Sequence, residues 1–213
     1  MDDLETFILT CVRPAVGDLP LDLLGHSMGG AVAAQFLVRH PETFRRAVLT
    51  SPMIAPSSGN VPMWAGHALA AFMCLIGKGK KRAFIAGPFD PAKEPFETSC
   101  STSRARFDYY QQKRVAMPCL QVCAPSYRWV LESIRQTGKL LDPALVGAIR
   151  TRVLLCQASD ETVVLTREQE QFVRLLKDGE FARFDGARHE IYNSVDATMQ
   201  PYVQKLLTFL LAD

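Results

Sequence analysis

A serine flanked by glycines stands where a strand-like segment meets a helix-like one, and this junction constrains the fold more than any other feature. Gly25-His26-Ser27-Met28-Gly29 fits the pattern G-x-S-x-G. The apolar run 21–25 before Ser27 is typical of a buried strand, and the small and apolar residues 31–38 are typical of a helix packed closely on a sheet. The glycines permit a sharp turn that lifts the Ser27 hydroxyl above the sheet edge, where a helix N-terminus points at it. The alternative interpretation is a glycine-rich turn without chemistry.

Strand-like and helix-like segments alternate at both ends of the chain but not in its middle. At the front the patterns predict a helix, a strand, a helix and a strand, over residues 2–11, 21–25, 31–38 and 45–50. At the back they predict a strand, a helix, a strand and a helix, over residues 152–156, 166–176, 180–184 and 201–211. We therefore predict an α/β core over residues 1–53 and 146–213, with a mostly parallel sheet flanked by helices.

The middle of the chain, residues 54–145, is predicted to be a helical insertion. It contains many helix breakers and three helix-like stretches, at residues 61–76, 104–115 and 126–137. The longest apolar stretch, 61–76, is interrupted by Pro62, Gly66 and His67, and is too short to predict a membrane span.

The charge, the cysteine pattern and the first residues argue against nucleic-acid binding, metal binding and secretion. A net charge of +2 gives no argument for a nucleic acid partner. The six cysteines are scattered, and Cys119 and Cys123 have no further cysteine or histidine nearby to complete a metal site. We expect six reduced thiols, which fits a cytoplasmic protein. Residues 1–10 lack the basic start and long apolar core of a signal peptide, so we expect a soluble protein that is at most peripheral to a membrane.

A serine nucleophile needs a base, and His189 is the best candidate among the four histidines. His189 follows the last predicted strand and therefore lies at the carboxyl edge of the sheet. His26 lies inside the turn and is expected to point away, His40 ends a helix, and His67 lies in the insertion.

The third member of the site must orient the base, and we predict Asp160 for this role. Asp160 follows the penultimate predicted strand, again at the carboxyl edge. Glu161 is adjacent but is expected to face elsewhere, and Asp185 is expected to cap the turn after the last strand. The order Ser27, Asp160, His189 is the chain order of α/β-hydrolase triads.

These motifs resemble the lysophospholipase L2 and monoacylglycerol lipase branch of the α/β-hydrolases, which are serine aminopeptidase S33-type hydrolases. Residues 25–30 match the nucleophile turn of that branch, residues 186–190 its histidine loop and residues 160–164 its acid loop. In the insertion, residues 104–109 and 125–130 are similar to lysophospholipase L2. The resemblance covers essentially the whole chain.

The resemblance implies hydrolysis of a carboxylic ester, with a monoacyl lipid such as a lysophospholipid or monoacylglycerol as substrate and with no metal or cofactor. Ser27 would attack the acyl carbonyl, His189 would pass the proton to the leaving alcohol, and the N–H of Met28 would face the oxyanion. The insertion would form a helical cap with an apolar acyl tunnel. Four aromatic residues of the insertion are candidate substrate contacts: Trp64, Phe72, Tyr127 and Trp129. An aromatic stripe at helical spacing also fits plain core.

The front of the chain departs from that branch, whose members carry four strands before the nucleophile strand and a His-Gly motif after the third. Only one predicted helix and a linker precede Ser27, and no His-Gly pair lies upstream. We therefore expect a sheet that lacks its N-terminal part and an oxyanion hole without a visible second donor.

Three further hypotheses stay open. Lys78, Lys80, Lys81 and Arg82 would meet anionic lipid headgroups, or form a solvated basic turn. The chain would be a general esterase or a proline-type aminopeptidase of the same fold. It would, alternatively, be an inactive chain that binds lipid or protein.

Overall fold

A parallel four-stranded sheet forms the centre of the computed structural model, which describes residues 2–59, 61–83, 87–122 and 124–212. The strands are β1 (Asp22–His26), β2 (Arg46–Thr50), β3 (Arg152–Ala158) and β4 (Gly179–Phe184). They lie in the order β1-β2-β3-β4, and every neighbouring pair is parallel. The carboxyl ends of all four strands therefore meet at one edge, as predicted.

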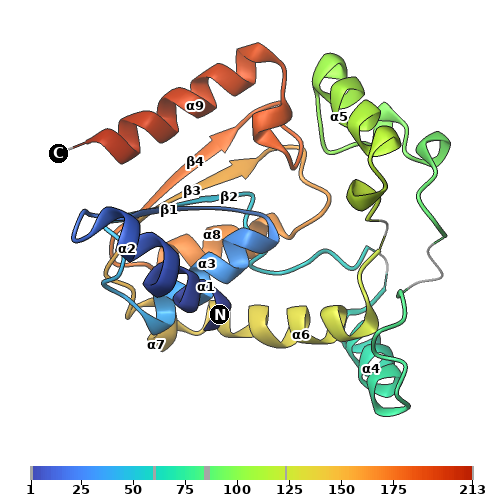
Figure 1. Cartoon of the computed structure of the whole chain (residues 1–213). Coiled ribbons are helices and arrows are strands. Elements are labelled where there is room, and N and C mark those ends of the chain that lie inside the picture. The colour runs from blue at the N-terminus through green and yellow to red at the C-terminus, as the bar shows by residue number, and fades with distance from the viewer. Residues whose placement is uncertain (1, 60, 84–86, 123, 213) are drawn as a thin grey trace.

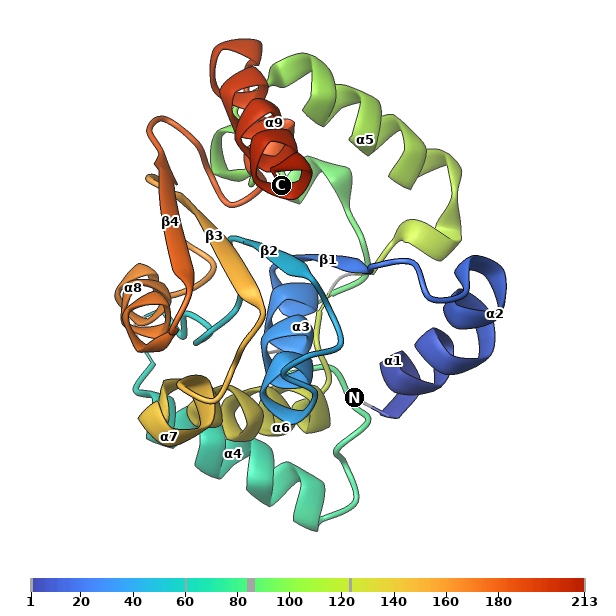
Figure 2. The same cartoon turned by 90° about the vertical axis from the view of Figure 1, so that its left-hand side faces the viewer.

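Helices cover both faces of the sheet (Figures 1 and 2). The helices of the core are α1 (Asp2–Phe7), α2 (Arg13–Val16), α3 (Met28–Arg39), α7 (Pro143–Val146), α8 (Thr166–Leu175) and α9 (Asp196–Leu211). A π-helical segment, Ile8–Val12, joins α1 to α2. The last helix begins at Asp196 rather than at Pro201, so the prediction of a helix over 201–211 was wrong at its start: Pro201 lies inside α9.

Alternating strand residues divide the core into two layers. Ala47, Leu49, Val153 and Leu155 face α3 and α8, where Phe36, Leu37 and Phe172 are fully buried against them. Val48, Leu154, Cys156 and Ala158 face α9, against Tyr202, Leu206 and Phe209. A sheet buried on both faces explains why these strands read as continuous apolar runs.

Within its described residues, the segment between β2 and β3 contains helices joined by turns and loops, and no strand longer than an isolated bridge. Its helices are α4 (Met63–Leu75), α5 (Arg104–Ala116) and α6 (Tyr127–Thr137), with 3₁₀ turns at Pro91–Lys93, Phe96–Thr98, Pro118–Leu120 and Gly138–Leu141. In Figure 1, α4 and α5 lie beyond the carboxyl edge of the sheet, whereas α6 runs alongside α3. Leu140, inside the predicted insertion 54–145, packs in the core layer under α8. The end of the insertion at residue 145 therefore stays a prediction.

The strand before Ser27 lies at the margin of the sheet. β1 pairs with β2 and, within the described residues, with no other strand. Leu24 in its middle is 55% exposed, whereas all five residues of β2 are buried. A strand of this apolar composition is expected to have partners on both sides and cover on both faces.

Close packing requires two glycines at the nucleophile turn, Gly25 and Gly30. Only the first of them belongs to the pattern G-x-S-x-G. A Cβ on Gly25 would lie 2.8 Å from the carbonyl oxygen of Gly29, and a Cβ on Gly30 would lie 2.7 Å from Cβ of Pro52. A Cβ on Gly29 would meet nothing within 4 Å. Gly25 and Gly30 let helix α3 approach the strands closely.

This difference predicts opposite effects of two neighbouring substitutions. Gly30→Ala forces a methyl group into Pro52 and should lower the free energy of unfolding by about 1–3 kcal/mol. Gly29→Ala adds a methyl group in open space within a helix and should leave stability unchanged or raise it by up to about 1 kcal/mol. Urea unfolding of both variants measures the difference, and equal destabilisation by the two would contradict the packing described here.

Candidate active site

Ser27 occupies a strained turn between β1 and α3. Its φ of 52° and ψ of −118° lie in a region that residues with a side chain rarely adopt. The turn is held by backbone hydrogen bonds from Ser27 N to the carbonyl of Thr50 (3.0 Å) and from Met53 N to the carbonyl of Ser27 (2.9 Å). Hydrogen bonds to β2 and to the segment after it therefore maintain this strained conformation. Ser27 is partly exposed at the carboxyl edge of the sheet.

His189 meets Ser27 across the sheet edge, as the sequence predicts. Its Nε2 lies 2.8 Å from the Oγ of Ser27. The imidazole is buried, with 6% of its side chain exposed. His189 lies on the loop after β4, between Gly186, which has a φ of 69°, and the 3₁₀ turn Ile191–Asn193.

The carboxylate beside His189 belongs to Glu161, and the prediction of Asp160 at this position was wrong. Nδ1 of His189 lies 2.7 Å from Oε2 of Glu161, whose side chain is completely buried. Asp160 is exposed, and its carboxylate accepts instead from the hydroxyl of Ser159 at 2.9 Å. The expectation that Glu161 faces elsewhere is therefore also wrong.

The backbone after Glu161 explains the choice of carboxylate. Oε1 of Glu161 accepts from the N–H groups of Thr162, Val163 and Val164, at 3.0, 2.8 and 3.4 Å. Burial alone would raise the pKa of Glu161, but the hydrogen bond from His189, its charge and these N–H groups together lower it. Glu161 is thus an anion at neutral pH, and it fixes the hydrogen of His189 on Nδ1, leaving Nε2 free to accept from Ser27.

Asp160 and Ser159 connect the acid loop to the histidine loop through the backbone. The N–H of Asp160 donates to the carbonyl of Ala187 at 2.9 Å, and the N–H of Gly186 donates to Oγ of Ser159 at 2.8 Å. The N–H of Asp160 therefore joins the two loops directly, and the Asp160 carboxylate contributes through the Ser159 hydroxyl that it accepts from.

His26 does not point away from the site. Its ring lies 5.0 Å from that of His189 and 5.1 Å from that of Tyr192, and its Nδ1 lies 2.9 Å from Oγ1 of Thr50. Burial, followed by the charge of His189, lowers the pKa of His26 to about 4, so His26 is neutral near pH 7. The alternation of side chains along the strand predicted that His26 points away from the site. This prediction was wrong because the strand ends at His26 and the alternation does not continue into the turn.

Met28 is the first residue of α3. Its backbone N–H therefore has no carbonyl of a preceding helical turn to donate to. Trp129 of α6 covers Met28 and donates from Nε1 to its sulfur at 3.1 Å. Trp129 also lines an apolar cavity of about 280 Å³, together with Pro56, Ser57, Val61, Met63 and Ile134. The cavity lies between α4, α6 and the segment after β2.

The other three aromatic candidates lie elsewhere. Trp64 and Phe72 are 76% and 57% exposed on α4 and line neither this cavity nor the core. Tyr127 starts α6 and is partly buried, and its N–H donates to the carbonyl of Lys81. A larger and more polar groove, of about 910 Å³, lies beside α5 and is lined by Tyr109, Tyr110, Glu190 and Tyr192.

No group of three or more potential metal ligands occurs among the residues that the structure describes. Five of the cysteines carry free thiols in the structure, and Cys123 lies outside the described residues. None of the described helices is long and apolar enough to cross a membrane.

Known proteins with similar sequences and structures identify the family and the fold of this chain. The chain is 31% identical to lysophospholipase L2 of Escherichia coli, over 98% of this chain and 62% of the relative. It is 24% identical to a probable lysophospholipase L2 of Haemophilus influenzae, over 88% of this chain and 58% of the relative. The chain thus spans about three fifths of the length of these curated relatives.

The fold is also that of a solved monoglyceride lipase. A soluble variant of the Saccharomyces cerevisiae enzyme, crystallised with a substrate analogue, superposes with a TM-score of 0.73 at 20% identity, covering 98% of this chain and 67% of that one. The family model for serine aminopeptidase, S33, matches residues 1–196. The chain therefore belongs to the serine aminopeptidase S33 family and has the α/β-hydrolase fold.

Proposed function

We propose that this chain carries the hydrolytic centre of a serine esterase that cleaves a monoacyl lipid, with Ser27 as nucleophile, His189 as base and Glu161 as the acid member. The observation that carries the proposal is the continuous hydrogen-bond chain from Ser27 Oγ through His189 to Glu161, with separations of 2.8 and 2.7 Å. Similarity to lysophospholipases L2 supports the substrate class.

The reaction follows from these positions. His189 accepts the Ser27 proton at Nε2 while Ser27 Oγ attacks the acyl carbonyl, and the buried Glu161 stabilises the imidazolium that forms. The oxyanion develops near the N–H of Met28 at the start of α3. His189 then gives the proton to the leaving alcohol, and a water molecule, activated by the same imidazole, releases the fatty acid.

The apolar cavity behind Trp129 is suited to the acyl chain. Its lining is mainly aliphatic and aromatic, and its volume of about 280 Å³ lies near the lower end of small-ligand sites. Trp129 both lines this cavity and contacts the side chain of Met28, the residue next to Ser27, so one wall of the cavity lies near the nucleophile. This arrangement favours an apolar acyl group over the amine of a peptide substrate.

Hydrolysis assays with purified chain test the proposal. A lysophospholipid, a monoacylglycerol, a short p-nitrophenyl ester and a proline p-nitroanilide are compared, each with the Ser27→Ala variant as control. We expect the lipid esters to be cleaved best and all activity to disappear in Ser27→Ala. Preference for the anilide would support an aminopeptidase instead, and folded protein that cleaves none of the four would support an inactive chain.

The choice between the two carboxylates gives a sharp prediction. Glu161→Gln removes the charge beside His189 and should lower kcat by roughly a thousandfold or more, because the neutral amide no longer fixes the correct tautomer. Asp160→Asn makes the same change one residue away, on an exposed side chain, and should stay within about threefold of the wild type. If Asp160→Asn is the damaging variant, the assignment of Glu161 is wrong.

The low pKa of His26 predicts how stability depends on pH. The pKa of His26 is about 4 in the folded chain against an ordinary 6.5, so unfolding takes up a proton between these values. His26 therefore stabilises the fold fully above about pH 6.5, and this contribution is lost as pH falls toward 4. In urea unfolding at about pH 7 and pH 5, His26→Gln should lose less stability than the wild type on acidification. Equal losses would contradict the assignment.

The outer face of α4 is suited to contact with a lipid surface. Five apolar side chains along it are exposed: Trp64, Leu69, Phe72, Leu75 and Ile76. The exposed Lys78, Lys80, Lys81 and Arg82 follow directly. An exposed apolar face next to a basic cluster matches the interface of an anionic membrane.

Leu75→Ser should therefore weaken cosedimentation with phosphatidylglycerol vesicles severalfold, because Leu75 is 84% exposed at the end of α4. Leu211→Ser is a matched control, since Leu211 is 75% exposed at the end of α9. Equal binding by both variants and the wild type would contradict a role for the α4 face, and no binding by any of the three would favour a solvated basic turn.

A further inference from the structure

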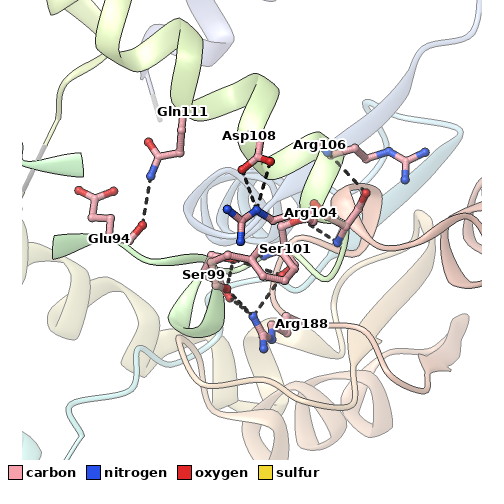
Figure 3. Close-up of polar contacts among 10 residues, drawn as sticks. Glu94, Ser99, Ser101, Arg104, Arg106, Asp108, Gln111 and Arg188 are labelled. Atoms are coloured by element: carbon pink, nitrogen blue, oxygen red, sulfur yellow. Dashed lines mark hydrogen bonds and ion pairs between the residues drawn. The ribbon is translucent and has the colours of Figure 1, made fainter. Parts of the chain in front are cut away.

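The arginine that precedes His189 in the chain contacts the cap rather than the site. Nη1 of Arg188 donates to three backbone carbonyls of one cap segment, those of Phe96, Ser99 and Ser101, at 3.0, 3.1 and 3.2 Å. Figure 3 shows the Arg188 side chain directed toward Ser99 and Ser101. We refer to Arg188 and these three carbonyls as the Arg188 clamp.

Further hydrogen bonds join the same two segments on both sides of the clamp. The N–H of Glu190, next to His189, donates to the carbonyl of Cys100 at 3.0 Å. The carbonyl of Asn193 accepts from Oγ of Ser101 at 2.6 Å and from the N–H of Ser103 at 3.2 Å. The histidine loop is thus attached to the cap along residues 188–193.

The attachment continues into α5. Arg106 donates from Nη1 to the carbonyl of Ser194 and from Nη2 to Oδ1 of Asp196, both at 2.6 Å. Arg104, two residues earlier on the same helix, donates from Nε to the carboxylate of Asp108 within α5, and its guanidinium lies 5.5 Å from the centre of the Phe96 ring. Figure 3 shows both arginines on the helix above the clamp.

We infer that Arg188 is a positioning residue, which holds the loop of His189 against cap segment 96–101 and so keeps His189 at hydrogen-bond distance from Ser27. This inference rests on the proposed function for its catalytic consequence. Glu161, Asp160 and Ser159 hold His189 and its loop from the side of the acid loop, and the clamp supplies the attachment to the cap.

The charge of Arg188 is needed at this place for an electrostatic reason. Three carbonyl oxygens that converge on one point repel one another, and a cation at their centre makes this arrangement favourable. The guanidinium also lies 5.8 Å from the centre of the Phe96 ring, a cation–π contact to the same segment. Nη1 of Arg188 already donates to three carbonyls. This favours a positioning role for Arg188 over the binding of an anionic lipid headgroup by that nitrogen.

Arg188→Ala, with Arg174→Ala as matched control, tests the catalytic consequence, since Arg174 is exposed and pairs with Glu170 within α8. Loss of the clamp should lower kcat for a short p-nitrophenyl ester by about 10- to 100-fold, because a small displacement of His189 breaks its alignment with Ser27, whereas KM should change less than about threefold. Arg174→Ala should resemble the wild type. Added guanidinium, compared with sodium at equal ionic strength, should restore part of the kcat of Arg188→Ala. A rise in KM with kcat unchanged, or equal effects of the two variants, would overturn the inference.

Amide hydrogen exchange tests the attachment independently of activity. In Arg188→Ala the N–H groups of Glu190 and Ser103 should both exchange faster, since each donates across the interface, and the N–H of Leu49 within the sheet should not change. Unchanged exchange at Glu190 and Ser103 would overturn the inference even if activity fell. If the wild-type chain hydrolyses no ester, the proposed function fails, and exchange alone decides whether Arg188 holds the loop.

Discussion

The hydrogen bond between Ser27 Oγ and His189 Nε2 joins residues 162 positions apart, and the rest of the structure can be understood from what this contact requires. It requires two strand ends at one edge, which the parallel sheet supplies. It also requires a serine in a strained turn, which close packing at Gly25 and Gly30 permits. Finally it requires an imidazole with its hydrogen on the far nitrogen, which the buried Glu161 provides.

The core and the first and last members of this site could be predicted from the sequence because their signals are local. Ser27 and His189 each follow a segment whose pattern predicts a strand, and parallel strands place such residues together. The choice between Asp160 and Glu161 could not be predicted in this way. It depends on how the backbone of Thr162, Val163 and Val164 folds back to donate three N–H groups to one carboxylate oxygen. The turn after β3 reverses the expected direction of two adjacent side chains.

The cap was harder to predict because helical periodicity does not say which partner a helical face meets. Trp64 and Phe72 have the spacing of a buried stripe, yet both are exposed on α4. Trp129, in contrast, reaches across from α6 to Met28 and lines the apolar cavity. The contacts of Arg188 were also invisible to sequence reasoning, because backbone carbonyls of residues 96–101 carry no side-chain signature. The expectation of an oxyanion hole without a visible second donor stays a prediction.

The central claim is that Ser27 is activated by His189 in this chain. A fluorophosphonate probe tests it most directly, because the probe reacts with an activated serine whatever the natural substrate. Intact-mass measurement followed by peptide mapping should find one adduct per chain, on Ser27. No adduct in folded protein, or an adduct on another serine, would contradict the account.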